Sequence, residues 1–132
     1  IPGGGCGVAD DAAGADVDVA AWAAAAAAAV RRGCQRHGFP EPLLMVEPGR
    51  AVIGPAGVAI YEVGARKHVS GVRTYVSVDG GMADNIRPAL YGAYHEIVNW
   101  TRLGSPATEL VTVVGPICET GDRLGSDQGA HA

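Results

Sequence analysis

The sequence predicts an α/β segment followed by an antiparallel β segment, with the change between them near residues 54–57. The first pattern behind this prediction is a helix-forming stretch followed by an uninterrupted apolar run, Leu43–Val46, which is typical of a buried parallel strand. The second is a set of β-branched, roughly alternating runs with the turn residues Ser70 and Gly71 between the first two: Val58–Val63, Val72–Val78 and Glu109–Val114. We therefore expect one unit in residues 1–56 and a second in residues 57–132.

The clearest helix follows the polar stretch of residues 10–18. Asp16 or Asp18 can cap its first turn, because an aspartate oxygen accepts from unpaired backbone N–H groups there. Gly38 can close the helix in a left-handed conformation. Four residues spaced four apart predict one buried stripe on this helix: Trp22, Ala26, Val30 and Cys34. At the other end of the chain, the small and polar residues 125–132 predict a frayed terminus.

Composition excludes several classes of protein. The net charge of −4 and the lack of a basic run argue against a nucleic-acid partner. The longest apolar stretch, Val19–Val30, is mostly alanine and too short to span a membrane, and Ile1-Pro2-Gly3 does not resemble a signal peptide. Three cysteines without metal-ligand spacing predict no disulfide framework and no metal site, so we expect a reducing, cytoplasmic compartment.

Two short segments in the first half of the chain are candidates for ligand binding. The glycines Gly3, Gly4 and Gly5 can expose backbone N–H groups to a phosphate, or they can form only a tight turn. The segment Glu47-Pro48-Gly49-Arg50 follows the predicted strand, and ligands bind at the carboxyl ends of parallel strands. Arginine grips carboxylate or phosphate with two parallel hydrogen bonds, but an ordinary surface ion pair is an equal alternative.

Two further groups lie in the second half. Arg87 and Tyr91 are four residues apart and would point the same way on a helical turn that starts near Pro88, as a carboxylate clamp or as a surface turn. Cys118 precedes Glu119, so the thiol could exchange protons beside an acid, or it could be a small buried apolar residue. Each of these groups is weak evidence by itself.

Taken in order, the segments are specific. The chain resembles the diaminopimelate decarboxylases, pyridoxal-phosphate (PLP)-dependent enzymes with an alanine-racemase-like fold. The resemblance covers nearly all of this chain but a minority of the family's length. It rests on five segments: Gly3–Gly5, Glu47–Arg50, Val78–Met82, Asp84–Tyr91 and Cys118–Asp122.

The resemblance implies a fold and a set of partners. Residues 1–56 would be the last part of a PLP-binding (β/α)8 barrel, with Gly3–Gly5 after strand seven and Glu47–Arg50 at the end of strand eight. Residues 57–132 would be the first part of an antiparallel β domain that makes dimer and substrate contacts. A homodimer would follow, with the region of Cys118 and Glu119 reaching the neighbouring subunit's site.

The resemblance also implies roles for individual residues. The backbone of Gly3, Gly4 and Gly5 would hold the PLP phosphate. The segment Glu47-Pro48-Gly49-Arg50 would also bind the cofactor, with Glu47 facing the pyridine nitrogen and keeping it protonated. Cys118 would be the catalytic acid that returns a proton to the substrate after carbon dioxide leaves. The far end of the substrate would be bound by four residues: Arg50, Arg87 and Tyr91 at its carboxylate and Glu119 at its ammonium group.

This arrangement favours diaminopimelate as the substrate, because a monoamino substrate such as ornithine would leave the arginines unpaired. Lys67, the chain's one lysine, lies in the β half and is not expected to attach PLP. In the family that lysine lies far upstream, so we expect a segment of a longer enzyme that is inactive alone. Two alternatives remain: a non-catalytic short paralogue that binds a full-length partner, and a related decarboxylase for another amino acid.

Overall fold

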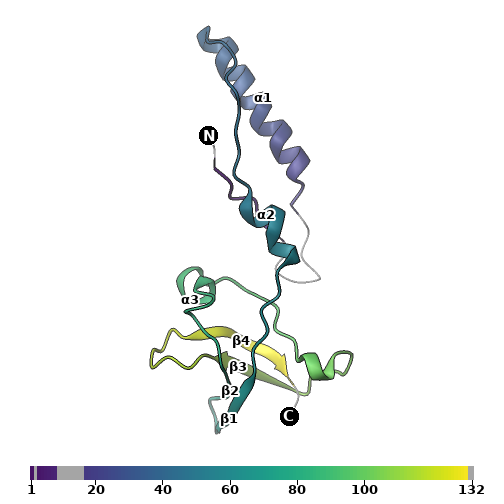
Figure 1. Cartoon of the computed structure of the whole chain (residues 1–132), viewed down its shortest axis with the longest axis vertical. Coiled ribbons are helices and arrows are strands. Elements are labelled where there is room, and N and C mark those ends of the chain that lie inside the picture. Colours follow the sequence, from purple (N-terminus) through teal and green to yellow (C-terminus); the bar gives the residue numbers. More distant parts are fainter. Residues whose placement is uncertain (2, 9–16, 131–132) are drawn as a thin grey trace. The chain divides into compact units, whose positions relative to one another are not determined.

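The structure of the 132-residue chain is a computed structural model, and it describes residues 1, 3–8 and 17–130. The chain divides into two compact units, Ile1–Val58 and Ala59–Ala132. Figure 1 shows that the first unit is helical and that the second is built on a sheet. In the described part of the chain, no helix combines the length and the apolar character that crossing a membrane requires.

The first unit contains α1 (Val19–His37), and this confirms the predicted helix. Asp18 caps its first turn, because its Oδ1 accepts the Ala21 N–H at 2.8 Å. Gly38 ends the helix at a φ of 69° and donates its N–H to the Cys34 carbonyl. Asp16, the other predicted cap, lies outside the described residues.

The apolar stripe of α1 is half-buried, whereas the sequence predicts a buried one. No residue of the helix is fully buried, and the four residues of the stripe have intermediate exposure: Trp22, Ala26, Val30 and Cys34. The reason is that, within its own unit, α1 makes no extensive contact with another helix or strand. The spacing of these four residues can therefore predict the helix without predicting how deeply its apolar stripe is buried.

The predicted strand at Leu43–Val46 does not form. The side chains of Leu43 and Met45 are exposed to 86% and 51%. A strand needs a hydrogen-bonded neighbour, and the described residues of this unit provide none for the segment. The chain then continues into α2 (Gly49–Ile53) and the 3₁₀ turn η1 (Gly54–Ala56), so Gly49 and Arg50 of the predicted ligand-binding segment lie in a helix.

The second unit is a four-stranded sheet in the order β1-β2-β3-β4. The pairs β1–β2 and β3–β4 are antiparallel, but β2–β3 is parallel, so the sheet is mixed and the prediction of an antiparallel β domain is wrong at this pair. The alternation of apolar and polar residues is the same in parallel and antiparallel strands. The sequence therefore did not distinguish the two kinds of pairing. The strands are Val63–Val69 (β1), Arg73–Val78 (β2), Glu109–Val114 (β3) and Arg123–Ala130 (β4).

Strand boundaries agree with the sequence in the middle of this unit and differ at its ends. The predictions for β2 and β3 are confirmed, but β1 begins at Val63, where the predicted strand ends. The predicted frayed end is wrong for residues 125–130, because they belong to β4; residues 131–132 lie outside the described residues. The glycine-rich and polar sequence of β4 has little strand propensity, and pairing with β3 determines its conformation.

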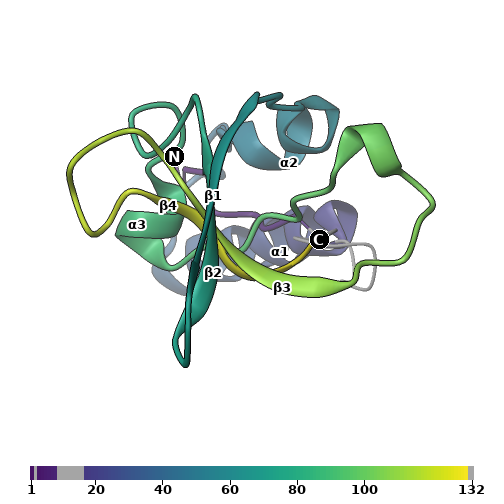
Figure 2. The same ribbon diagram turned by 90° about the horizontal axis from the view of Figure 1, so that it is seen from below.

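A long crossover joins the parallel strands β2 and β3. Residues 79–108 contain α3 (Arg87–Tyr91) and the 3₁₀ turn η2 (Trp100–Arg102). A parallel pair requires such a crossover, since a tight turn cannot return the chain to the same end of the sheet. α3 packs against β4, as Figure 2 shows.

The core of the second unit lies on one face of the sheet. Val78, Val111, Val113 and Leu124 are buried there. Tyr61 and Ile97 pack against them from outside the strands, and their side chains are half-buried. Burial of each such side chain contributes on the order of 2 kcal/mol, so this small core stabilises the sheet that carries the loops described next.

Candidate active site

In the first unit, the glycine segment lies against Glu47. The Glu47 N–H donates to the Gly3 carbonyl at 2.9 Å, and the Gly49 N–H donates to the Glu47 carbonyl at 2.9 Å. A Cβ at Gly4 would collide with the Glu47 carbonyl oxygen and lie 3.3 Å from the Pro48 Cα. Two segments more than forty residues apart in the sequence therefore meet backbone to backbone, and glycine is required for the approach.

Gly3 and Gly5 flank this contact in the left-handed region, with φ of 74° and 78°. No described atom lies within 4 Å of a Cβ built on either residue, so their outer sides are open. Such a backbone can present N–H groups to an anion without obstruction. The side chains of Glu47 and Arg50 are exposed beside it, and Arg50 lies in α2 with its Cγ 3.2 Å from a Cβ built on Gly54.

In the second unit, the loops that follow β2 and β3 leave the sheet at the same edge, because these strands are parallel. The Gly80-Gly81-Met82 segment follows β2, and the loop of residues 115–122 follows β3. The first leads to Arg87 and Tyr91, and the second carries Cys118 and Glu119. The topology thus brings two of the sequence-predicted groups to one edge of one sheet.

Hydrogen bonds to carboxylates fix the segment after β2. Asp79 Oδ1 accepts the Glu62 N–H at 2.8 Å, and Asp84 Oδ2 accepts the Gly81 N–H at 2.8 Å. The Tyr61 ring lies over Gly80, where a Cβ would collide with it. Burial, with added repulsion from Asp84 and Asp79, raises the pKa of the Tyr61 phenol. This tyrosine therefore stays neutral at physiological pH, and its ring packs against the turn at Gly80.

Arg87 and Tyr91 are adjacent in space, as their spacing predicts. Arg87 is the first residue of α3, and its guanidinium carbon lies 5.6 Å from the centre of the Tyr91 ring. The backbone N–H of Arg87 donates to Asn85 Oδ1 at 3.2 Å, which fixes the start of the helix. Tyr91 is 69% exposed, so its phenol is accessible to a ligand, and Arg87 beside it has intermediate exposure.

Cys118 and Glu119 lie at the tip of the loop after β3, and both are exposed. The Cys118 thiol is therefore not the buried apolar residue that was the alternative prediction. Glu119 Oε1 accepts the Gly121 N–H at 2.9 Å and the Thr120 hydroxyl at 3.2 Å. Its carboxylate is oriented by its own loop, and Oε2 has no hydrogen-bond partner among the described residues.

Asp122 is a residue whose role the sequence did not reveal. It is only 3% exposed, and its two oxygens accept the N–H groups of Met82 (2.6 Å) and Ile117 (2.8 Å). These partners are backbone groups from separate segments, so no side-chain spacing indicates them. The only available signal was the presence of glycines, Gly81 and Gly115, in the segments that follow the two parallel strands.

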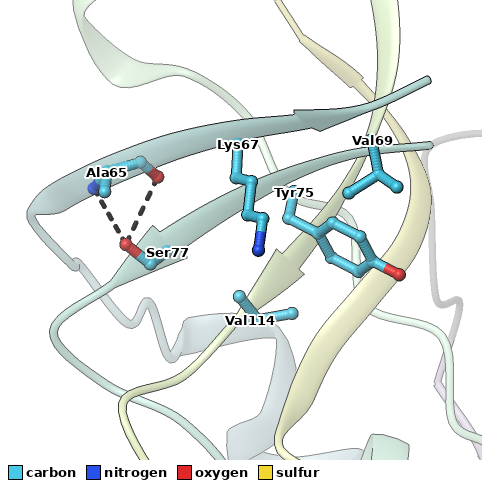
Figure 3. Close-up of a pocket in the computed structure, with 6 residues that line it drawn as sticks. All are labelled: Ala65, Lys67, Val69, Tyr75, Ser77 and Val114. Atoms are coloured by element: carbon cyan, nitrogen blue, oxygen red, sulfur yellow. Dashed lines mark hydrogen bonds between the residues drawn. The ribbon is translucent and has the colours of Figure 1, made fainter.

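A hollow of about 410 Å³ lies on the other face of the sheet from the core (Figure 3). It is lined by Ala65, Lys67, Val69, Tyr75, Ser77 and Val114. Ser77 Oγ accepts the Ala65 N–H at 2.8 Å at its rim, and Lys67 and Tyr75 are cross-strand partners. None of the predicted catalytic, cofactor-binding or substrate-binding residues lines this hollow.

The structure thus brings the predicted residues together in two groups, one in each unit. Gly3, Gly4 and Gly5 meet Glu47–Arg50 in the first unit. Arg87 and Tyr91 share a sheet edge with Cys118 and Glu119 in the second.

Comparison with known proteins identifies the family. The model of the C-terminal sheet domain of pyridoxal-dependent decarboxylases matches residues 8–131. The chain belongs to this family. It is 47% identical over 106 residues to a diaminopimelate decarboxylase from Synechocystis sp., and 49% identical over 96 residues to one from Bacillus subtilis. These matches cover 80% and 73% of this chain but 23% and 22% of the relatives, so the chain spans about a quarter of their length.

Solved structures share the fold of this chain. A crystal structure of diaminopimelate decarboxylase has a TM-score of 0.75 and 33% identity, covering 97% of this chain and 31% of that chain. The protein SrLDC, solved in complex with PLP and cadaverine, has a TM-score of 0.62 and 27% identity, covering 98% of this chain and 32% of that chain.

The described residues fit the requirements of PLP at both ends of the cofactor. Its phosphate needs several N–H donors without obstructing side chains, and the open sides of Gly3 and Gly5 meet that need. Its pyridine nitrogen needs an acidic partner, and the exposed Glu47 carboxylate lies on the segment bonded to the glycines. The donor set in the first unit is therefore compatible with this cofactor.

Proposed function

We propose that this chain forms part of a PLP-dependent decarboxylase that converts meso-2,6-diaminopimelate to L-lysine, the last step of lysine biosynthesis. The observation that carries the proposal is that the segment leading to the Arg87–Tyr91 pair and the Glu119 loop both leave parallel, paired strands at one sheet edge. The unreactive end of diaminopimelate bears one carboxylate and one ammonium group, for which an arginine and a carboxylate are matched partners. Similarity to relatives named diaminopimelate decarboxylase supports the same substrate.

When bound, PLP supplies the electron sink for breaking a carbon–carbon bond. We assign its phosphate to the backbone of Gly3, Gly4 and Gly5, and its ring nitrogen to Glu47, which keeps a proton there. Pro48 and Gly49 hold Glu47 and Arg50 on either side of the start of α2, and the bond from Gly49 N–H to the Glu47 carbonyl supports this.

For the substrate, we assign the far carboxylate to Arg50, Arg87 and Tyr91 and the far ammonium group to Glu119. The Arg87 guanidinium stacks on the Tyr91 ring, which limits its rotamers before the ligand arrives. Glu119 keeps Oε2 free of described partners while Oε1 is held by its loop. Both groups are thus preorganised, and the entropy that binding costs is reduced.

We assign the proton-donating step to Cys118. Its side chain is exposed at the tip of the loop, so it can approach a substrate carbon after carbon dioxide leaves. We also propose a cytoplasmic homodimer in which this loop reaches the neighbouring subunit's site. The three unpaired cysteines among the described residues are consistent with a reducing compartment.

The lysine that attaches PLP is, in this proposal, not Lys67. That residue lies on β1 and faces the hollow of Figure 3, whose lining includes no proposed cofactor-binding residue. The matches cover only 23% and 22% of the relatives, and we propose that the attaching lysine belongs to the rest of a longer polypeptide. The holoenzyme is then that complete polypeptide with PLP, and the 132 residues alone are inactive.

The test is an assay of the holoenzyme with meso-diaminopimelate, with lysine measured as the product. We expect turnover, and we expect Arg87→Gln to raise KM for diaminopimelate about 30-fold, equivalent to about 2 kcal/mol of lost charge-assisted hydrogen bonding. Arg102→Gln, at an exposed arginine of η2, is the matched control and should leave KM unchanged. Absence of lysine formation with PLP bound would refute the assignment and favour the non-catalytic paralogue.

A second candidate is decarboxylation of another amino acid, favoured by the likeness to SrLDC with bound cadaverine. The two candidates differ in what Arg87 contacts. For a substrate without a far carboxylate, Arg87→Gln should leave KM unchanged or lower it, because the arginine has no partner. Diaminopimelate, lysine, ornithine and arginine should be compared as substrates of the wild-type enzyme and of the Arg87→Gln variant. This comparison decides between the two candidate functions.

A further inference from the structure

We propose that Asp122 is a positioning residue of this decarboxylase, whose buried carboxylate holds the Cys118–Glu119 loop against the segment that leads to Arg87. The inference rests on the proposed function for its catalytic consequence. Its structural basis stands separately, on hydrogen bonds among the described residues of the second unit.

The carboxylate joins two segments that are thirty-five residues apart along the chain. Oδ1 accepts the Met82 N–H at 2.6 Å, after β2, and Oδ2 accepts the Ile117 N–H at 2.8 Å, after β3. Asp122 is 3% exposed, and neither of the ion pairs formed by the described residues includes it. A buried carboxylate with two backbone donors is a strong, directional link, because the burial of Asp122 limits the access of water to its two oxygens.

The link reaches the catalytic loop through its backbone. The Asp122 N–H donates to the Glu119 carbonyl at 3.0 Å, and the Asp122 carbonyl accepts the Gly115 N–H at 3.0 Å. The loop of residues 115–122 is therefore closed at its base by Asp122 and supported near its tip by the Ile117 bond. Cys118 is one residue from that bond, so displacement of the carboxylate moves the thiol.

The link reaches the substrate-binding pair through a short series of bonds. The Gly81 carbonyl, next to Met82, accepts the N–H groups of Asp84 (2.9 Å) and Asn85 (3.0 Å). Asn85 Oδ1 then accepts the Arg87 N–H at 3.2 Å, at the start of α3. Each bond fixes the next turn of the chain, so the position of Met82 determines where α3 begins.

The surroundings accept a carboxylate of this size and little else. A Cβ on Gly81 or Gly115 would collide with the Asp122 side chain, so a glycine is needed in each of the segments that follow β2 and β3. Two N–H donors approach from two segments, and only a carboxylate offers two acceptor oxygens to them. Asparagine has nearly the same shape, but its amide would direct a donor at one of the N–H groups. Asp122→Asn is thus a near-isosteric test of the link.

The experiment compares holoenzyme carrying Asp122→Asn with the wild type and with Asp127→Asn. Asp127 is an exposed residue of β4 at a φ of 55°, a conformation that asparagine tolerates, and is the matched control. We expect Asp122→Asn to lower kcat and raise KM for diaminopimelate, with kcat/KM falling about 10- to 100-fold, as for a small misplacement of reacting groups. The Kd for PLP should change less than twofold, because the proposed cofactor residues lie in the other unit.

Hydrogen exchange on the same proteins locates the change. Faster exchange at Met82 and Ile117, with unchanged exchange in β1 and β2, is the expected result. Faster exchange at these amides with wild-type kcat and KM would reduce Asp122 to a purely structural role and overturn the proposal. Unchanged exchange at both amides would overturn it as well. Should Asp122→Asn not fold, as judged by circular dichroism, Asp122→Ser removes the carboxylate with less volume and takes its place.

Failure of the proposed function is distinguishable from failure of this inference. A wild-type holoenzyme that does not decarboxylate diaminopimelate refutes the function, and the alkylation rate of Cys118, mapped by mass spectrometry, then tests the link. We expect Asp122→Asn to change that rate at least threefold, while the rate at Cys34 in α1 stays constant. Equal rates in the variant and the wild type would mean that Asp122 does not position the thiol.

Discussion

The two units hold their functional segments by different means. In the first, Cys6 is the only buried apolar residue described, and the glycine segment meets Glu47 through one backbone bond and a close approach at Gly4. In the second, a core of four residues and several carboxylate–backbone bonds fix the loops. Substitutions in the first unit should therefore affect ligand binding or one helix, whereas those in the second should affect the stability of a whole sheet.

The largest effect that this comparison predicts follows from Gly81→Ala. The new Cβ overlaps the Asp122 carboxyl group, so the variant must give up the bonds to Met82 and Ile117 or shift the backbone. We expect a loss of about 3 kcal/mol in the free energy of unfolding of the second unit. Urea titration followed by hydrogen exchange in β2 and β3 measures it.

The control for that variant is Gly71→Ala, in the turn between β1 and β2. Gly71 has a φ of 73° and open space around it, so only backbone strain of about 1 kcal/mol applies. Equal losses for the two variants would show that the carboxylate network adds nothing to the second unit, and the contrast between the units would disappear.

The next effect concerns Gly4→Ala in the first unit. A Cβ there collides with the Glu47 carbonyl, so the two proposed cofactor-binding segments must separate. We expect the Kd of the holoenzyme for PLP to rise at least tenfold, or about 1.4 kcal/mol, with unchanged hydrogen exchange in the sheet. Gly33→Ala in α1, where no described atom lies within 4 Å, should leave the Kd unchanged. A Kd unaffected by Gly4→Ala would mean that the close approach is not part of the cofactor site.

A smaller effect tests whether α1 depends on its cap more than on packing. Asp18→Ala removes the acceptor for the Ala21 N–H and should cost about 1 kcal/mol, seen as faster amide exchange in the first turns of α1. Asp18→Asn keeps an oxygen at that position and should behave as the wild type. If the alanine variant exchanges normally, contacts other than the cap hold the helix start.

The smallest effect compares one ion pair from each unit. Arg66 donates to both Glu109 oxygens at 2.7 and 2.8 Å across the sheet, with the Glu109 side chain 19% exposed. The Arg31–Glu41 pair has side chains exposed to 58% and 52%. Double-mutant cycles should give about 1 kcal/mol for the first pair and about 0.3 kcal/mol for the second. Equal coupling energies would show that the sheet gives its ion pair no added rigidity.

The sequence predicted local features well where one segment contains the whole signal. α1 with its glycine end and the strand Glu109–Val114 agree with the structure, because spacing and turn residues determine them. The adjacency of Arg87 and Tyr91 follows from helical spacing in the same way. The strand predicted at Leu43–Val46 does not form, because an apolar sequence indicates burial but does not provide a neighbouring strand for pairing.

Features that depend on distant partners were not predictable. β4 has the sequence Arg-Leu-Gly-Ser-Asp-Gln-Gly-Ala, and only its register with β3 makes it a strand. The parallel pairing of β2 and β3 leaves no trace in either strand's alternation. Asp122 was visible as part of a motif, but its partners are backbone N–H groups, and every residue except proline has one.

The parallel pairing of β2 and β3 has a consequence for how such a domain can diversify. The two loops emerge side by side because of the strand register, whatever chain lies between them. Those parts of the crossover of residues 79–108 that do not pack against the sheet, unlike α3 and Ile97, can therefore be exchanged without moving the thiol loop. New substrate contacts can thus be engineered on the exposed positions of this crossover, while Cys118, the proposed proton donor, stays at a separate, unaltered strand end.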